Sequence, residues 1–453
     1  MTTPDSPSNR VRALRWALLI PLAVVPLVLT QSSPSRTEVR TPVVADAAID
    51  AALSDPPLTG GLRADELAFF ERRLADDPGD VLAIRRLAAL HQMRFRANGD
   101  SDELVQSAAH LDRLAERHTG DAALWSMRTS LALATHDFPG ALAAAERRLG
   151  LGEPADPSGR YGHFDALWAS GRYDEARELL EGLDPERESI VHLSREARLI
   201  DGLGDVARSA EIMQRVVELA DAWAEPALVR AWARVEHGHF LLHSGSPEAS
   251  ADRFAEALEI IPAYPAALEG LASIAYGVDG RLRAAERLYR AALDRGAHLD
   301  LYGVLIEIAE AHDDPAAVDS LRSAFVTRAG SDADSERLYR RPLALTLADD
   351  PATHDRALAL AEADLADRQD RMAWATRGWV LRAMGRLDEA AVDADRAVAW
   401  GAPTPEVLFR SGVILAEAGE AARGEALVRE ALEGRAELGP VTSAMLDDWL
   451  ARR

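Results

Sequence analysis

The stretch VEHGHFLLHSG concentrates side chains that could bind a metal ion. It holds His237, His239 and His243, with Glu236 beside them. His239 and His243 are four residues apart and share one helix face, which is the spacing by which HExxH helices bind zinc. Here, however, the glutamate precedes both histidines, and a catalytic zinc needs three protein ligands and an open position. Asp201 and Glu236 are candidates for the third ligand, so a metal-binding or metal-dependent activity centred on Glu236, His239 and His243 is the alternative hypothesis.

The leading interpretation treats these histidines as part of a scaffold. His237 precedes the small Gly238 and is expected to pack toward a partner helix, while His239 and His243 line a polar groove. The sequence has no phosphate-binding GxxxxGK, no GxSxG and no dinucleotide fingerprint. It also has no cysteine, which excludes thiolate ligands and thiol catalysis. We therefore expect no catalytic residues, no metal and no cofactor.

The composition favours helices and excludes one class of partner. Of the 453 residues, 74 are acidic and 51 are basic, which gives a formal net charge of -23. Such a chain repels nucleic acid, because the nucleic-acid backbone is itself a polyanion. Alanine, leucine and arginine are abundant, and β-branched runs are scarce, so the elements that position any site should be helices.

The first residues predict export. Three arginines precede a 15-residue uncharged stretch from Trp16 to Thr30. At ~1.5 Å per residue this stretch spans roughly 22 Å, less than a bilayer core of about 30 Å. A signal peptide and an uncleaved signal anchor both fit residues 1–30, and both place the remainder in the periplasm or on another extracytoplasmic face of the membrane. Residues 31–61, rich in Pro, Ser and Ala, are interpreted as a spacer.

From residue 62 onward the pattern is helical and repetitive. Residues 374–401 match the segment 34 residues later, and small residues recur twelve positions apart across a short turn. Two small residues at this spacing allow two antiparallel helices to approach closely. The matching pairs are Gly378 with Gly412, Gly385 with Gly419, Ala390 with Gly424, and Ala397 with Ala431.

These units resemble tetratricopeptide repeats. The residues on the signature positions are Trp374, Gly378, Leu381, Gly385, Ala390, Ala394 and Ala397. The resemblance implies an all-α fold, a right-handed solenoid of antiparallel helix pairs. It is strong over residues 226–438 and looser over residues 62–225, where the repeats are irregular. The resemblance also implies a scaffold or adaptor that binds a protein or peptide partner in a concave groove lined by the first helix of each pair.

The repeat frame assigns side chains to that groove. Aromatic residues and arginines are the types that most often anchor protein interfaces, although each could instead pack between repeats or pair internally. The predicted groove residues are Tyr161, Asp165, Trp168, Arg195, Arg198, Asp201, Trp232, Glu236, His239, His243, Tyr302, Glu310, Trp379, Arg382, Phe409 and Glu417.

The last residues, 439–453, are expected to form a capping helix. Met445, Leu446, Trp449 and Leu450 would cover the final repeat or dock into a second chain, so self-association through this helix is an open alternative. The membrane is expected to be contacted only through the N-terminal hydrophobic segment.

Overall fold

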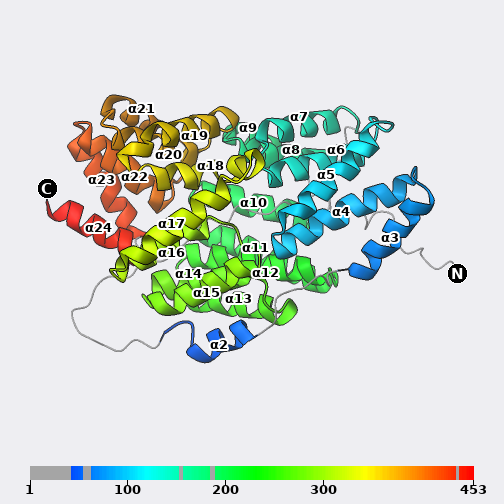
Figure 1. The fold of residues 1–453 in the computed structure, drawn as a ribbon, viewed down its shortest axis with the longest axis horizontal. Coiled ribbons are helices and arrows are strands. Elements are labelled where there is room, and N and C mark those ends of the chain that lie inside the picture. The colour runs from blue at the N-terminus through cyan, green and yellow to red at the C-terminus, as the bar shows by residue number, and fades with distance from the viewer. Residues whose placement is uncertain (1–41, 55–62, 153–156, 184–188, 435–437, 453) are drawn as a thin grey trace. The chain divides into compact units, whose positions relative to one another are not determined.

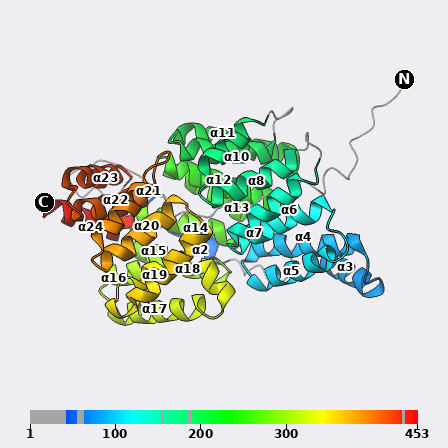
Figure 2. The same ribbon diagram turned by 90° about the horizontal axis from the view of Figure 1, so that it is seen from above.

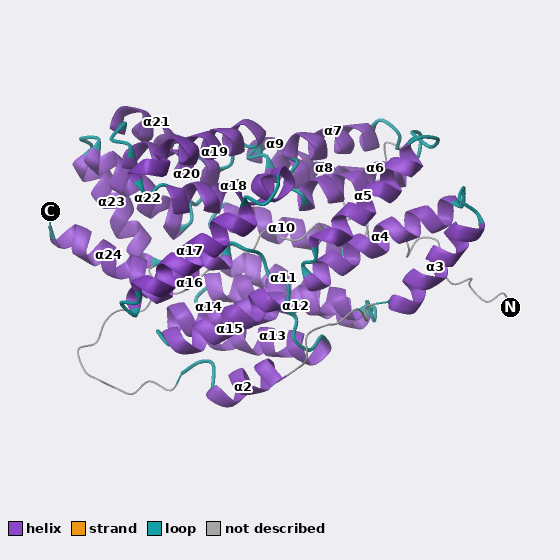
Figure 3. Ribbon diagram, in the orientation of Figure 1, coloured by secondary structure: helices purple, strands orange, loops and turns teal. Residues whose placement is uncertain are grey.

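A computed structural model describes residues 42–54, 63–152, 157–183, 189–434 and 438–452. The predicted leader, residues 1–30, lies outside the described residues. Within the described ranges every regular element is a helix, and no strand is present (Figure 3). None of these helices is both long and apolar enough to cross a membrane.

The helices form two compact units (Figure 1). Unit 1 contains α3 to α9, and unit 2 contains α10 to α24 together with α2. Unit 1 consists of α3 (Ala64–Asp76), α4 (Val81–Asn98), α5 (Ser101–Ala115), α6 (Ala122–Ala134), α7 (Phe138–Leu149), α8 (Pro157–Ala169) and α9 (Tyr173–Glu181).

Unit 2 contains seven helix pairs, an N-terminal helix and a C-terminal helix. Figure 2 shows the succession of the later pairs, from yellow to red. The elements are α2 (Asp46–Ser54), α10 (Ile190–Gly202), α11 (Val206–Ala222), α12 (Ala227–His243), α13 (Pro247–Ile260), α14 (Pro265–Ser273), η2 (Ile274–Val278), α15 (Leu282–Asp294), α16 (Leu301–Ala311), α17 (Pro315–Ala329), α18 (Ala333–Leu347), η3 (Pro351–Thr353), α19 (His354–Asp367), α20 (Arg371–Ala383), α21 (Leu387–Ala397), α22 (Pro405–Glu417), α23 (Ala421–Glu433) and α24 (Gly439–Ala451).

Small residues twelve positions apart bring the two helices of a pair together, as the sequence predicts. The Ser250 hydroxyl on α13 donates a 2.7 Å hydrogen bond to the Gly238 carbonyl on α12. Between α22 and α23 the approach is closer still, because a Cβ on Gly424 would lie 2.4 Å from the Gly412 carbonyl oxygen. A side chain at either glycine would push the helices apart.

Capping aspartates and turn residues define where the helices of a pair begin. Asp137 and Asp205 accept hydrogen bonds from the first-turn N–H groups of α7 and α11. The turn inside the pair needs a left-handed residue, which is Gly245 (φ 89°) before α13 and Gly419 (φ 105°) before α23. In looser pairs a non-glycine takes this conformation, such as His136 (φ 53°) before α7.

The N-terminal helix α2 falls inside the range interpreted as a spacer. It packs against α15 in unit 2, and Figure 1 shows the blue α2 beside the green α13 and α15. Its Ile49 is completely buried in the same core as Leu268 and Leu288. At least residues 43–54 are therefore part of the folded unit rather than a free connection.

The C-terminal helix α24 packs on its own chain. Leu446 is fully buried, and Trp449 and Leu450 cover the same apolar cluster as Val428 of α23. α24 also contacts η2 and α16. Met445 is the member of the predicted set that stays exposed.

Candidate functional site

The predicted groove residues of α10 and α12 meet along two successive first helices. His243 Nδ1 lies 2.6 Å from an Asp201 carboxylate oxygen, which joins the end of α12 to the end of α10. Arg198 of α10 acts electrostatically on Glu236 of α12. We refer to Arg195, Arg198, Asp201, Trp232, Glu236, His239 and His243 as the first-helix face.

Glu236 is the most unusual group on this face. Its side chain is 4% exposed, and it accepts a hydrogen bond from the Trp232 side chain. Burial raises the pKa of Glu236 to about 8, against the opposing influence of Arg198 and the Trp232 hydrogen bond. The carboxyl is therefore mostly protonated near pH 7.

His239 has little polar contact. Its ring packs edge-on against Phe254, with the ring centroids 5.1 Å apart, and neither ring nitrogen has a hydrogen-bond partner. Burial lowers the pKa of His239 to about 4. The neighbouring His237 is buried between the helices, as expected, and burial together with Arg253 lowers its pKa to about 4. Both imidazoles are neutral at pH 7.

The geometry does not support the metal hypothesis. His243 is engaged by Asp201, and Glu236 accepts from Trp232. Across the described residues, no group of three or more His, Cys, Asp or Glu side chains is arranged to hold a metal ion. Glu236, His239 and His243 share a helix face, but they do not form a ligand set.

The other predicted groove residues lie on four further first helices, α8, α16, α20 and α22. Arg382 of α20 makes two 2.8 Å bonds to Glu417 of α22, and its guanidinium lies 4.5 Å over the Trp379 ring. Trp379 in turn contacts Phe409, with centroids 5.5 Å apart. On α16 the Tyr302 hydroxyl accepts a 3.1 Å bond from Arg328, while Glu310 is exposed.

Several predicted groove residues are core residues. Tyr161 and Asp165 on α8, Arg195 on α10 and Tyr302 on α16 are all buried. Trp168 is half-buried and stacks on Phe164 within α8. The repeat frame gave their helix and register, but it did not distinguish a residue that lines a surface from one that packs between repeats.

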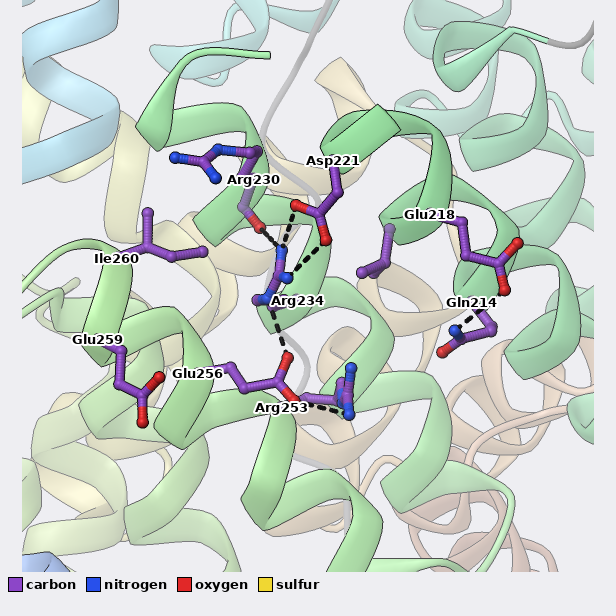
Figure 4. A pocket seen from close by; sticks show the side chains of 10 residues that line it. Gln214, Glu218, Asp221, Arg230, Arg234, Arg253, Glu256, Glu259 and Ile260 are labelled. Carbon is purple, nitrogen blue, oxygen red and sulfur yellow. Dashed lines mark hydrogen bonds and ion pairs between the residues drawn. The ribbon is translucent and has the colours of Figure 1, made fainter. Parts of the chain in front are cut away.

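A hollow of about 500 Å³ lies on α11, α12 and α13 (Figure 4). Arg234 lies near its centre and donates to both Asp221 oxygens, at 2.7 and 3.1 Å, and to Glu256 at 2.9 Å. Arg253 also pairs with Glu256, at 2.7 Å. By helical spacing, the Arg234 side of α12 lies opposite the first-helix face. Sequence reasoning missed this hollow, because its charges look like ordinary surface ion pairs.

The chain is distantly similar to several solved structures. No family model matches the chain, and no curated protein matches it. Among solved structures, a tetratricopeptide repeat protein from Parabacteroides merdae matches at 14% identity with a TM-score of 0.32, over 54% of this chain and 93% of that one. The all-α fold of successive helix pairs is shown by this chain's own helices and their packing.

Two further solved structures are similar over most of the chain. Cut9–Hcn1, described as a hetero-tetramer of APC/C, matches at 14% identity with a TM-score of 0.43, covering 84% of this chain and 71% of that one. Yeast Tom70 matches at 11% identity with a TM-score of 0.31, covering 82% and 96%. These likenesses concern the fold; the site is defined by the side chains described above.

Proposed function

We propose that the protein is a non-catalytic scaffold that binds a protein or peptide segment on its first-helix face. The observation that carries this proposal is the row formed by Trp232, His239 and His243 on α12, all half-buried, beside Arg198 on α10. An indole, imidazoles and a guanidinium together offer apolar area with a polar edge, which is the chemistry of interface anchors.

The partner is a protein rather than a nucleic acid. The net charge of -23 disfavours a polyanionic ligand. A segment with apolar side chains and a few hydrogen-bonding groups suits a face whose His239 is neutral and whose Glu236 is protonated near pH 7. Binding would be non-covalent and would add no chemical step.

We also propose that the scaffold is exported and held at the membrane by residues 16–30. The sequence pattern of this segment supports the proposal. A tether raises the local concentration of the scaffold for a membrane-associated partner. Fractionation of the native cells, with sequencing of the mature N-terminus, tests the location and distinguishes a cleaved leader from an anchor.

The binding proposal is tested by crosslinked co-purification of the full-length chain from its native membranes. A stoichiometric partner should be recovered with the wild type and lost with Trp232→Ala or Arg198→Ala. Arg230→Ala is the matched control, because Arg230 lies on the opposite side of α12 and should leave recovery unchanged. Equal loss with the Arg230 variant, or turnover of a substrate by the purified chain alone, would contradict the proposal.

A further inference from the structure

Residues 43–54, which we name the strap, are bound by unit 2 in the manner of a peptide ligand. The strap consists of a bend at residues 43 and 44 followed by Ala45 and α2, and it lies 228 or more residues before α15, on which it packs. The hydrogen bonds and ion pairs to its backbone and its acidic side chains come from residues 279–295, and its apolar side chains join the core to which α15 belongs. In a peptide-recognition site, separate residues likewise contact the backbone, the charged side chains and the apolar side chains of the ligand.

The N-terminal end of the strap is held through its main chain. The Asp279 carboxylate accepts from the Val43 N–H at 2.9 Å and from the Val44 N–H at 3.1 Å. Arg281 Nη1 donates to the Val44 carbonyl at 2.7 Å. Because these are backbone contacts, they fix the register of a bound segment without demanding a particular side chain.

Arginines on the α15 side select acidic side chains. Arg281 pairs with Asp46, and Arg287 pairs with Asp50 at 2.8 Å. At the far end Arg295 contacts the Leu53 carbonyl, at 3.4 Å. Residues 281–295 contain five arginines and two acids, whereas the strap contains two acids and no basic residue. Residues 281–295 are therefore locally basic, although the chain as a whole is strongly acidic.

Few apolar residues of the strap are buried against unit 2. Val44, Ile49 and Ala52 are the buried strap residues, and Ala284, Leu288 and Ala291 recur on α15 at the spacing of one helix face. A nine-residue helix is marginal in water and depends on such contacts. Both ion pairs are largely exposed, so water and salt weaken them. The ion pairs therefore contribute little, and the main apolar contribution of the strap comes from Val44, Ile49 and Ala52.

We propose that the α15 face is a binding site for a short acidic amphipathic helix of a partner protein, and that the strap is its intramolecular occupant. The partner segment carries a bend with two free backbone N–H groups, then a helix with acids four apart on one side and aliphatic residues on the other. It displaces the strap by occupying Asp279, Arg281 and Arg287. This site lies on a second helix, so the inference stands independently of the first-helix face.

The test uses the full chain and a synthetic peptide of residues 42–54 that carries a dye at its C-terminus. Val44→Asp with Ile49→Asp releases the strap and empties the site. In fluorescence anisotropy, the released chain should bind the peptide at least about tenfold more tightly than the wild type, in which the strap competes. Adding Asp279→Asn or Arg281→Ala to the released chain should remove this gain. Arg283→Ala, an exposed arginine of α15 with no role in the site, is the matched control.

Equal peptide binding by the released and wild-type chains, or binding that Asp279→Asn leaves unchanged, would overturn the proposal. A concentration-dependent dimer that Asp279→Asn abolishes would identify a second copy as the occupant, and would overturn the assignment to a partner protein. Hydrogen exchange on the wild type gives an independent check. The α2 amides should exchange through a local opening faster than those of α15; exchange of both helices in one event would show that the strap is not displaceable.

Discussion

Two carboxylates of unit 2, the buried Glu236 and the half-buried Asp370, are held in opposite ways. Glu236 on the first-helix face has one hydrogen bond from Trp232 and no ion pair within hydrogen-bonding distance among the described residues, and burial raises its pKa to about 8. Asp370, just before α20, lies among Arg341, Arg368 and the first turn of α20. Burial alone would raise its pKa, but Arg341 and Arg368 reverse this and lower it to about 2.

The difference lies in the partners that each carboxylate has. Arg341 Nη2 bonds to both Asp370 oxygens, at 2.7 and 2.8 Å, and Asp370 accepts from the Ala373 N–H at 2.7 Å. Asp370 is thus held by Arg341 of the preceding helix pair and by the first turn of its own helix. For Glu236, by contrast, burial outweighs the opposing influence of Arg198 and of the Trp232 hydrogen bond, and the neutral form is favoured.

The largest expected effect concerns Glu236→Gln. The pKa of Glu236 is higher in the folded than in the unfolded chain, so its stabilising contribution is present below about pH 4.5 and is lost as the pH rises through 8. Relative to the wild type, the glutamine variant should gain about 4 kcal/mol in free energy of unfolding between pH 4 and pH 9. Urea unfolding at a series of pH values measures this difference. A constant difference across that range would show that Glu236 is ionised in the folded chain.

Arg341→Met should have the next largest effect. It tests the ion pairs around Asp370. It leaves Asp370 and Asp364 with Arg368 as their remaining cation, and should lower the free energy of unfolding by about 3 kcal/mol at pH 7. Arg356→Met is the control, because Arg356 pairs with Glu336 at an exposed position and should change stability by less than about 1 kcal/mol. Similar losses of stability in both variants would show that the Arg341 pairs contribute no more than the exposed Arg356 pair.

Asp370→Asn tests the ionisation of Asp370 directly. The asparagine can still cap α20, so the loss isolates the charge. Because the folded pKa is lowered, the stabilisation is present above about pH 3.8 and is lost as the pH falls toward 2. The variant should be less stable by about 2 kcal/mol at pH 7 and should converge with the wild type near pH 2. Asp319→Asn, at an exposed position, should follow the wild type at every pH.

The smallest expected effect concerns Trp232→Phe. It removes the indole hydrogen bond that lowers the pKa of Glu236. The pH midpoint of the Glu236-dependent stability change should move upward by up to about one unit, since a hydrogen bond to the charged form favours that form. A downward shift would mean that water or another group replaces the indole and solvates Glu236 better.

The helix pairs could be predicted from the sequence because they depend on local rules. Small residues twelve apart, such as Gly412 and Gly424, make close helix crossings possible, and Gly419 supplies the left-handed turn between them. In unit 1 the position twelve before Ala176 is the large Phe164, yet α8 and α9 still pair. One small residue is enough when the other helix places an aromatic side chain in the core.

The place where the strap packs does not follow from local sequence rules. The run ADAAIDAALS has helix-forming composition and places Ile49 and Ala52 one turn apart, which was a signal for an amphipathic helix within the predicted spacer. The partners of that helix lie more than 220 residues away, in Asp279 and Arg281. A single sequence does not show which distant surface a short helix packs against.

The sequence by itself determined the all-helical class, the repeat period and the register of each first helix, because helix propensity, turn chemistry and small-residue spacing act over a few residues. The tertiary structure alone decided which of those first-helix side chains are exposed. It buried Tyr161 and Arg195, left Trp232 at the surface, separated His239 from any ligand set, and placed the strap on α15. Burial and charge pairing depend on neighbours brought together from distant repeats, and those neighbours set the pKa values and the surfaces on which function depends.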